Sequence, residues 1–246
     1  FRLKPRELQI TYRADPELVE KARSTLMKAG DTEAMTAYHD KLVQLQKQGV
    51  GLKGSLTDLL QPMFAYAQER SRDNDPIAEN QALLAVLGAW SSKGLAQLVP
   101  DAVERPQRFR LKLEKRTDFG QHFLTSAALA AKADGSLADA IGLAKEIADS
   151  DGGSGFSFTD IAADRAGTRF GEVATASPQN ARLVQAFMAK GAKQGDIIPK
   201  ATDLPEHMNK AEFERRFGGV GSPAYEEVMR TIETRLANCT LYKKYG

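Results

Sequence analysis

One histidine and several carboxylates stand in the C-terminal half of the chain at spacings that place them on shared helix faces. In the segment DFGQHFLTSAALAA, Asp118, His122 and Ser126 are four residues apart and so lie on one face of a predicted helix. The next two predicted helices carry similar polar stripes, Glu146 and Asp149 in LADAIGLAKEIAD and Asp160, Asp164 and Thr168 in SFTDIAADRAGTRFG. Because consecutive helices usually pack together, we expect the three stripes to converge.

A histidine surrounded by carboxylates suits two kinds of catalysis. With a divalent metal, the candidate ligands are His122, Glu146, Asp149, Asp160 and Asp164, and the metal would acidify a bound water for hydrolysis. Without a metal, His122 together with Glu146 or an aspartate would act as a general base, and His122 and Glu146 are the candidate catalytic groups. The sequence has no HExxH motif, so no cofactor is specified beyond a candidate divalent metal.

A structural interpretation of the same residues stays open beside the catalytic ones. In this interpretation His122 belongs to a buried polar network that anchors the glycine loop, with Arg165 or Lys145 as ion-pair partner. The loop itself, GGSGFS at residues 152–157, lacks the lysine of a Walker A motif and is not a nucleophile elbow. Its expected role is to lead into a helix capped by Ser157, whose N-terminus could also hold an anion.

The elements that must position these residues are mainly helices. Four pairs combine an N-cap side chain with a proline at the first helical position, namely Asp15–Pro16, Asp75–Pro76, Ser177–Pro178 and Ser222–Pro223. Between such starts the apolar residues recur at helical spacing, as in ENQALLAVLGAW. We therefore predict a mainly α, multi-helix, bundle-like protein whose small residues, such as Ala127, Ala163, Gly167 and Gly171, let helices approach closely.

Only two stretches alternate as strands do, ELQITYR at residues 7–13 and RFRLKLEKR at residues 108–116. They predict one small two-stranded antiparallel β ribbon, which helices would have to cover. The second stretch also marks the expected internal boundary. We predict an N-terminal helical half over residues 1–105 and a C-terminal helical half over residues 106–246 that carries the polar cluster, with the two halves able to pack as one domain.

Composition excludes several classes of partner. The 34 basic and 32 acidic residues are spread along 246 residues, unlike the concentrated basic surface of nucleic-acid-binding proteins, so no nucleic acid is expected as a partner. No apolar run approaches the roughly 20 residues needed to cross a bilayer, so no membrane-spanning segment is expected. Cys239 is the single cysteine, which rules out an internal disulfide.

Residues 118–172 resemble the YfiM-type family of bacterial envelope lipoproteins. The matching motifs are DFGQHFLTSAAL, AKEIADS and GGSGFSFTDIAADRAGTRFG. The resemblance implies an exported or envelope-anchored protein of no established activity, with family-like polar positions at His122, Glu146, Asp149, Asp160 and Asp164. The chain departs from that family in its long N-terminal half and in having no lipidation cysteine in its numbered region.

Two functions follow as expectations. The first is a non-catalytic, envelope-associated helical protein with a binding or scaffold role toward a protein or envelope partner, located in the periplasm or anchored to the membrane facing it. The basic start FRLKPREL is consistent with an N-terminal anchor before it, and equally with trimming of the chain at this point. The second is a metal-assisted hydrolase that uses His122 and nearby Glu and Asp residues, and a cytoplasmic location is the alternative compartment.

Overall fold

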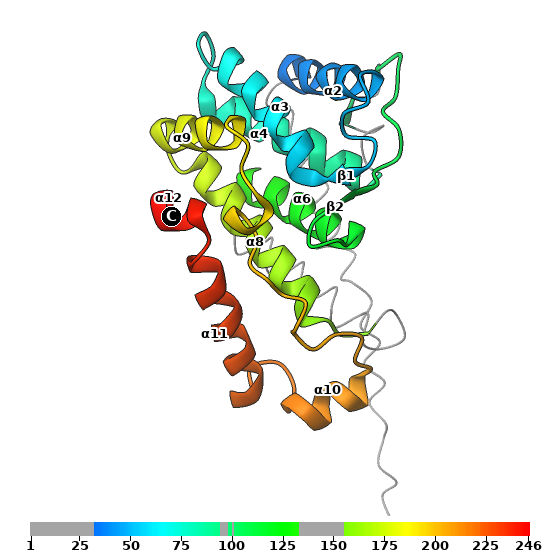
Figure 1. The fold of residues 1–246 in the computed structure, drawn as a ribbon, viewed down its shortest axis with the longest axis vertical. Helices are drawn as coiled ribbons and strands as arrows, with labels where there is room; N and C mark the ends of the chain where they lie inside the picture. The colour runs from blue at the N-terminus through cyan, green and yellow to red at the C-terminus, as the bar shows by residue number, and fades with distance from the viewer. Residues whose placement is uncertain (1–31, 94–97, 100, 133–154) are drawn as a thin grey trace, which may run out of the picture.

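The computed structural model describes residues 32–93, 98, 99, 101–132 and 155–246, and over these ranges the protein is mainly helical, which confirms the predicted fold class (Figure 1). The helices of the first half are α2 (Thr32–Lys47), α3 (Leu56–Arg70) and α4 (Pro76–Ser91). Those of the second half are α6 (Thr117–Lys132), α8 (Phe158–Thr175), α9 (Pro178–Ala189), the short 3-10 helix η1 (Gln194–Asp196), α10 (Lys210–Phe217), α11 (Pro223–Ala237) and α12 (Thr240–Tyr245). No helix in the described ranges has both the length and the apolar character needed to cross a membrane.

Helix starts follow the local chemistry that the sequence predicts. Three of the predicted N-caps, Asp75, Ser177 and Ser222, accept backbone N–H groups of the first turn while proline occupies the first helical position. Ser157 likewise caps α8 by accepting the N–H of Asp160. These four starts are confirmed, and the remaining predicted pair, Asp15–Pro16, lies outside the described residues.

The antiparallel ribbon predicted over residues 7–13 and 108–116 is wrong for the part that the structure describes. The two-residue strand β2 (Leu111–Lys112) pairs in parallel with β1 (Gly54–Ser55), with Gly54 opposite Leu111. Alternation in RFRLKLEKR arises because Phe109, Leu111 and Leu113 are buried on one side of an extended segment. That pattern reports one buried face and carries no information about the partner strand or its direction. Residues 7–13 lie outside the described ranges.

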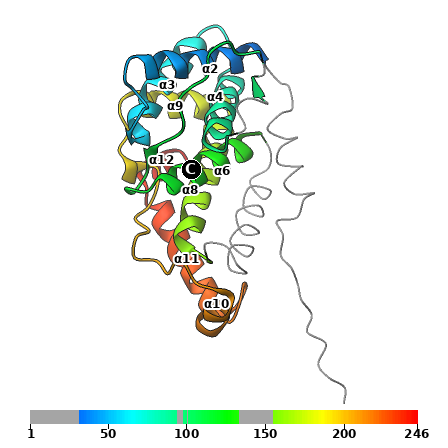
Figure 2. The ribbon, with the colours of Figure 1, turned by 90° about the vertical axis from the view of Figure 1, so that its right-hand side faces the viewer.

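One hydrophobic core joins the described parts of the predicted halves 1–105 and 106–246. Its centre is α4, which is apolar on nearly every face and packs against α2, α3, α6, α8 and α9. In both views α10 and α11 lie at the end of the molecule opposite α2 and α3, and α8 connects the two ends (Figures 1 and 2). The described helices of both halves share this core, as expected if the halves pack as one domain. The boundary near residue 105 stays a prediction.

The closest packing in the fold joins α6 to α8 through small residues, as predicted. A Cβ atom added at Gly167 would overlap the backbone carbonyl oxygen of Phe123, and one at Gly171 would overlap that of Ala127. Facing backbones can approach this closely only where no side chain separates them. This contact brings the polar stripes of the two helices within hydrogen-bonding distance of each other.

We predict that Gly167→Ala lowers the free energy of unfolding by about 2 kcal/mol, because the added methyl group meets rigid backbone that cannot move aside. Alanine is about 1 kcal/mol better than glycine in an unhindered helix, so an unchanged or increased stability would contradict the packing described. Urea denaturation measures the difference. The control is Gly195→Ala, where no atom lies within 4 Å of the new Cβ and a change within about 0.5 kcal/mol is expected.

Candidate functional site

The polar stripes of α6 and α8 meet where His122 faces Asp164. The Nδ1 atom of His122 lies 3.1 Å from each carboxylate oxygen of Asp164, and the hydroxyl of Ser126 donates to Asp164 Oδ1 at 2.8 Å. On the other side of the ring, His122 Nε2 lies 3.8 Å from Asp160 Oδ2. Since an ionised carboxylate only accepts hydrogen bonds, this geometry suits an imidazole that carries its proton on Nδ1.

These groups are largely withdrawn from solvent. The side chains of His122, Asp160 and Asp164 are 10%, 9% and 7% exposed. A charged or polar group this deeply buried is stable only if partners replace the water that it has lost. The contacts among His122, Ser126 and Asp164 meet that requirement for Asp164.

A cation that the sequence analysis did not single out, Arg116, joins this cluster to two other parts of the chain. Its Nε lies 3.1 and 3.2 Å from the two carboxylate oxygens of Asp118, and its Nη2 lies 3.2 Å from Asp160 Oδ1. Its Nη1 donates to Glu206, in the segment before α10, and to the hydroxyl of Thr159 at 3.1 Å. We call Arg116, Asp118, Asp160 and Glu206 the Arg116 network.

Arg116, Asp118 and Glu206 have pKa values shifted in the directions expected for ion pairs. Burial alone would raise the pKa of Asp118, but hydrogen bonds and charge from Arg116 outweigh it and hold that pKa below its ordinary value. For Glu206, burial is likewise outweighed by hydrogen bonds from Thr159 and Arg116, so its pKa is lowered. The hydrogen bond to Asp118 raises the pKa of Arg116 although burial opposes it. Arg116, Asp118 and Glu206 are therefore charged near neutral pH.

The described end of the glycine loop serves the fold. Gly155 has a φ of +91°, and a Cβ there would overlap the backbone of His207. Phe156 exchanges backbone hydrogen bonds with Met208, and the N–H of Phe158 donates to the carbonyl of Pro205. Two of the first amides of α8, those of Phe158 and Asp160, are thus bonded to Pro205 and Ser157.

Of the predicted metal ligands, the structure places His122, Asp160 and Asp164, whereas Glu146 and Asp149 fall outside the described residues. Within the ranges that are described, no group of three or more histidine, cysteine, aspartate or glutamate side chains is arranged to hold a metal ion. Of the candidate catalytic residues His122 and Glu146, only His122 lies in the described ranges. Lys145 is also outside the described ranges, and Arg165 makes an ion pair with Glu233 of α11.

Two residues of the predicted stripes, Asp118 and Thr168, form no side-chain hydrogen bond with His122 or Asp164 in the described structure. Asp118 joins the cluster only through Arg116, and the buried hydroxyl of Thr168 has no hydrogen-bond partner among the described residues. Arg116 has one sequence signal, its position two residues before Asp118, on the chain that enters α6. Glu206 has none, because it lies 90 residues from Arg116 in an irregular segment.

We predict that Arg116→Gln lowers the free energy of unfolding by about 2 kcal/mol at neutral pH, because it removes the cation from the buried Asp160 and from the more exposed Asp118 and Glu206. The side chain of Arg116 is 24% exposed, so the loss is smaller than for a fully buried pair. The control Arg169→Gln breaks an exposed pair with Glu172, for which less than about 0.5 kcal/mol is expected.

The pH dependence of this difference follows from the lowered pKa values. A carboxyl group with a lowered folded pKa stabilises the protein above its ordinary pKa, here 3.8 for Asp118 and 4.5 for Glu206, and loses that effect as the pH falls further. The gap between wild type and Arg116→Gln should therefore narrow between about pH 5 and pH 3 in urea titrations. A gap that stays constant over this range would contradict the assigned role.

Comparison with known proteins gives no relative: no family model, no curated protein and no solved structure matches this chain. The resemblance of residues 118–172 to the YfiM-type envelope lipoproteins therefore stays a prediction.

Proposed function

We propose that this chain is a non-catalytic helical protein of the bacterial envelope with a binding or scaffold role, and that the cluster around His122 and Arg116 holds its helices together. The observation that carries this proposal is the position of Arg116, whose guanidinium lies among Asp118, Asp160 and Glu206. The ion pairs connect α6, α8 and the segment before α10. A brace between elements that are distant in sequence is the expected use of such a network.

The charge around Asp160 supports a structural role over a metal site. Asp160 Oδ1 lies 3.2 Å from Nη2 of Arg116, so a fixed cation already compensates this carboxylate. A divalent ion bound beside it would be repelled by the guanidinium at short range, in a region where few water molecules screen the charges. Metal-assisted hydrolysis through His122 and Asp160 is disfavoured for this reason.

The hydrogen bonds of Ser126 also favour the structural role. Its hydroxyl donates to Asp164, and the same carboxylate accepts from His122. A serine nucleophile is activated when a histidine accepts its proton, and here the carboxylate takes the place of that histidine. The arrangement is that of an aspartate held by two donors, as expected when α6 and α8 need a buried polar link.

The envelope location and the binding role rest on the resemblance of residues 118–172. That resemblance favours the periplasm, or attachment to the membrane facing the periplasm, and a protein or envelope component as partner. The long N-terminal half, which the family lacks, is where we place the partner-binding surface.

The test of the proposal combines metal titration with substitution of His122. We expect Zn²⁺, Mn²⁺ and Mg²⁺ to leave the melting temperature unchanged, because a ligand that binds the native state would raise it by mass action. We expect His122→Asn to lower the free energy of unfolding by about 2 kcal/mol, since Asp164 loses a buried donor. The matched control is His207→Asn, at a side chain that is mostly exposed, with little expected effect.

Metal analysis of the purified proteins decides between the two functions. Stoichiometric metal in the wild type that is lost in a folded His122→Asn variant would overturn the structural role. Circular dichroism of both variants establishes that they are folded before the metal content is compared.

A further inference from the structure

A second site lies away from the His122 cluster, where the C-terminal end of α4 meets the extended segment before β2 and the first turns of α6. It is a hollow of about 380 Å³, within the range of small-molecule pockets and near its lower end. The residues that matter for its chemistry are Trp90, Lys93, Arg105, Arg108, Phe109 and Gln121. We call this hollow the Trp90 groove.

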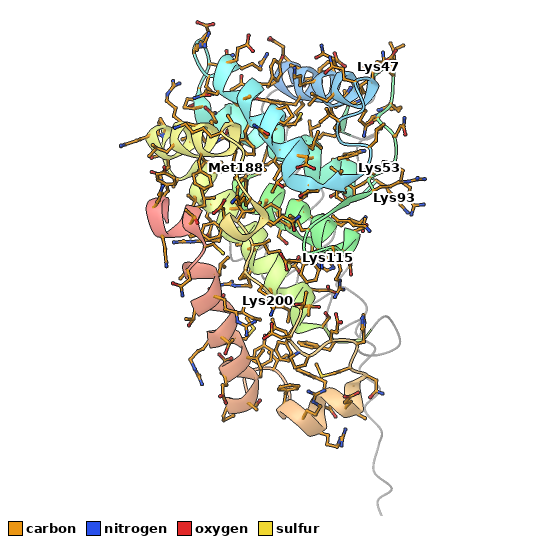
Figure 3. The ribbon with its side chains drawn as sticks, in the orientation of Figure 1. Lys47, Lys53, Lys93, Lys115, Met188 and Lys200 are labelled. Atoms are coloured by element: carbon orange, nitrogen blue, oxygen red, sulfur yellow. The ribbon has the colours of Figure 1, made fainter. Side chains whose placement is uncertain are left out.

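The Trp90 groove is cationic. Lys93, Arg105 and Arg108 line it, and no aspartate or glutamate is among its described lining residues. In the described part of the chain neither Lys93 nor Arg108 has an ion-pair partner, and Lys93 lies at the right-hand edge of the molecule in Figure 3. Three cations around a concave surface favour an anionic ligand.

The floor of the groove is aromatic, and its two rings are held in a fixed orientation. The rings of Trp90 and Phe109 meet edge to face, with centroids 5.0 Å apart, and the indole Nε1 donates to the carbonyl of Gln107 at 2.7 Å. Both residues are only 5% exposed, so they form the floor of the groove. A preformed apolar floor suits the apolar body of a ligand, since little ordering is needed on binding.

The polar residues of the groove are also held in place. Gln121 Nε2 donates to the carbonyl of Ser91 at 3.0 Å, and Arg105 Nη1 donates to the carbonyl of Val99 at 2.7 Å. The backbone N–H of Gln107 donates to Gln46 of α2 at 2.7 Å, which fixes the extended segment against that helix. These contacts therefore hold Arg105, Gln121 and the extended segment in place beside the aromatic floor.

We propose that the Trp90 groove binds a small amphipathic anion, a carboxylate or sulfonate on an aromatic or short acyl body. The anionic group pairs with Arg108 and Lys93, and the apolar body lies against Trp90 and Phe109. This inference rests on the proposed binding role of the chain and names the class of ligand. It does not depend on the His122 cluster.

Trp90 is the single tryptophan of the chain, so all indole fluorescence comes from the floor of the groove. The probes are 8-anilinonaphthalene-1-sulfonate, which accepts energy from tryptophan, and octanoate as a competitor. We expect saturable energy transfer from Trp90 and its reversal by octanoate. Sodium sulfate, which has no apolar body, and octanol, which has no charge, should not compete at equal concentration.

The variants test the two cations against a matched control. Arg108→Gln and Lys93→Gln should each weaken probe binding about tenfold, as expected for the loss of one charged contact. Arg110→Gln, two residues along the same exposed segment and outside the groove, should bind as the wild type does. Circular dichroism verifies the fold of each variant.

Three results would overturn the inference: no saturable energy transfer, competition by octanol equal to that by octanoate, or equal binding by Arg108→Gln and Arg110→Gln. Each of these results would rule out a small amphipathic anion as the ligand of the Trp90 groove. None of them bears on the structural role of the His122 cluster. Failure of the proposed function appears in a different readout, as metal bound through His122.

Discussion

A single guanidinium, that of Arg116, pairs with three carboxylates and links α6, α8 and the segment before α10. Arg116 lies just before α6 and contacts Asp118 in the first turn of that helix, Asp160 at the start of α8 and Glu206 from the segment before α10. Its planar side chain also stacks on the ring of Phe119, 4.6 Å from the ring centroid, which fixes its direction. No other described ion pair joins three separate parts of the chain in this way.

This interaction is possible because α6 and α8 approach so closely. Gly167 and Gly171 let backbone meet backbone, because at these two positions no side chain separates the helices. Where the polar stripes of the two helices meet, His122 and Ser126 both form hydrogen bonds with the carboxylate of Asp164. A carboxylate that close packing brings into the interface loses its water and needs hydrogen-bond donors from the protein. The close packing of α6 and α8 therefore requires donors such as His122 and Ser126.

Local chemistry explains what could be predicted from the sequence. The N-caps at Asp75, Ser177 and Ser222 depend on residues within one turn, and helical spacing put His122 on the face that meets Asp164. Long-range partners could not be predicted in this way. Glu206 reaches Arg116 across 90 residues, and the partner of β2 is a parallel strand 57 residues earlier, Gly54 opposite Leu111, which the alternation in RFRLKLEKR does not encode.

If Arg116 stabilises the fold through Asp160, the two side chains are energetically coupled, and a double-mutant cycle between them measures that coupling directly. The cycle compares the wild type, Arg116→Gln, Asp160→Asn and the double variant by urea denaturation at neutral pH. A coupling energy of about 1–2 kcal/mol in favour of the native pair is expected for charges in direct contact. Additive effects of the two substitutions, with no coupling, would contradict the role assigned to the Arg116 network.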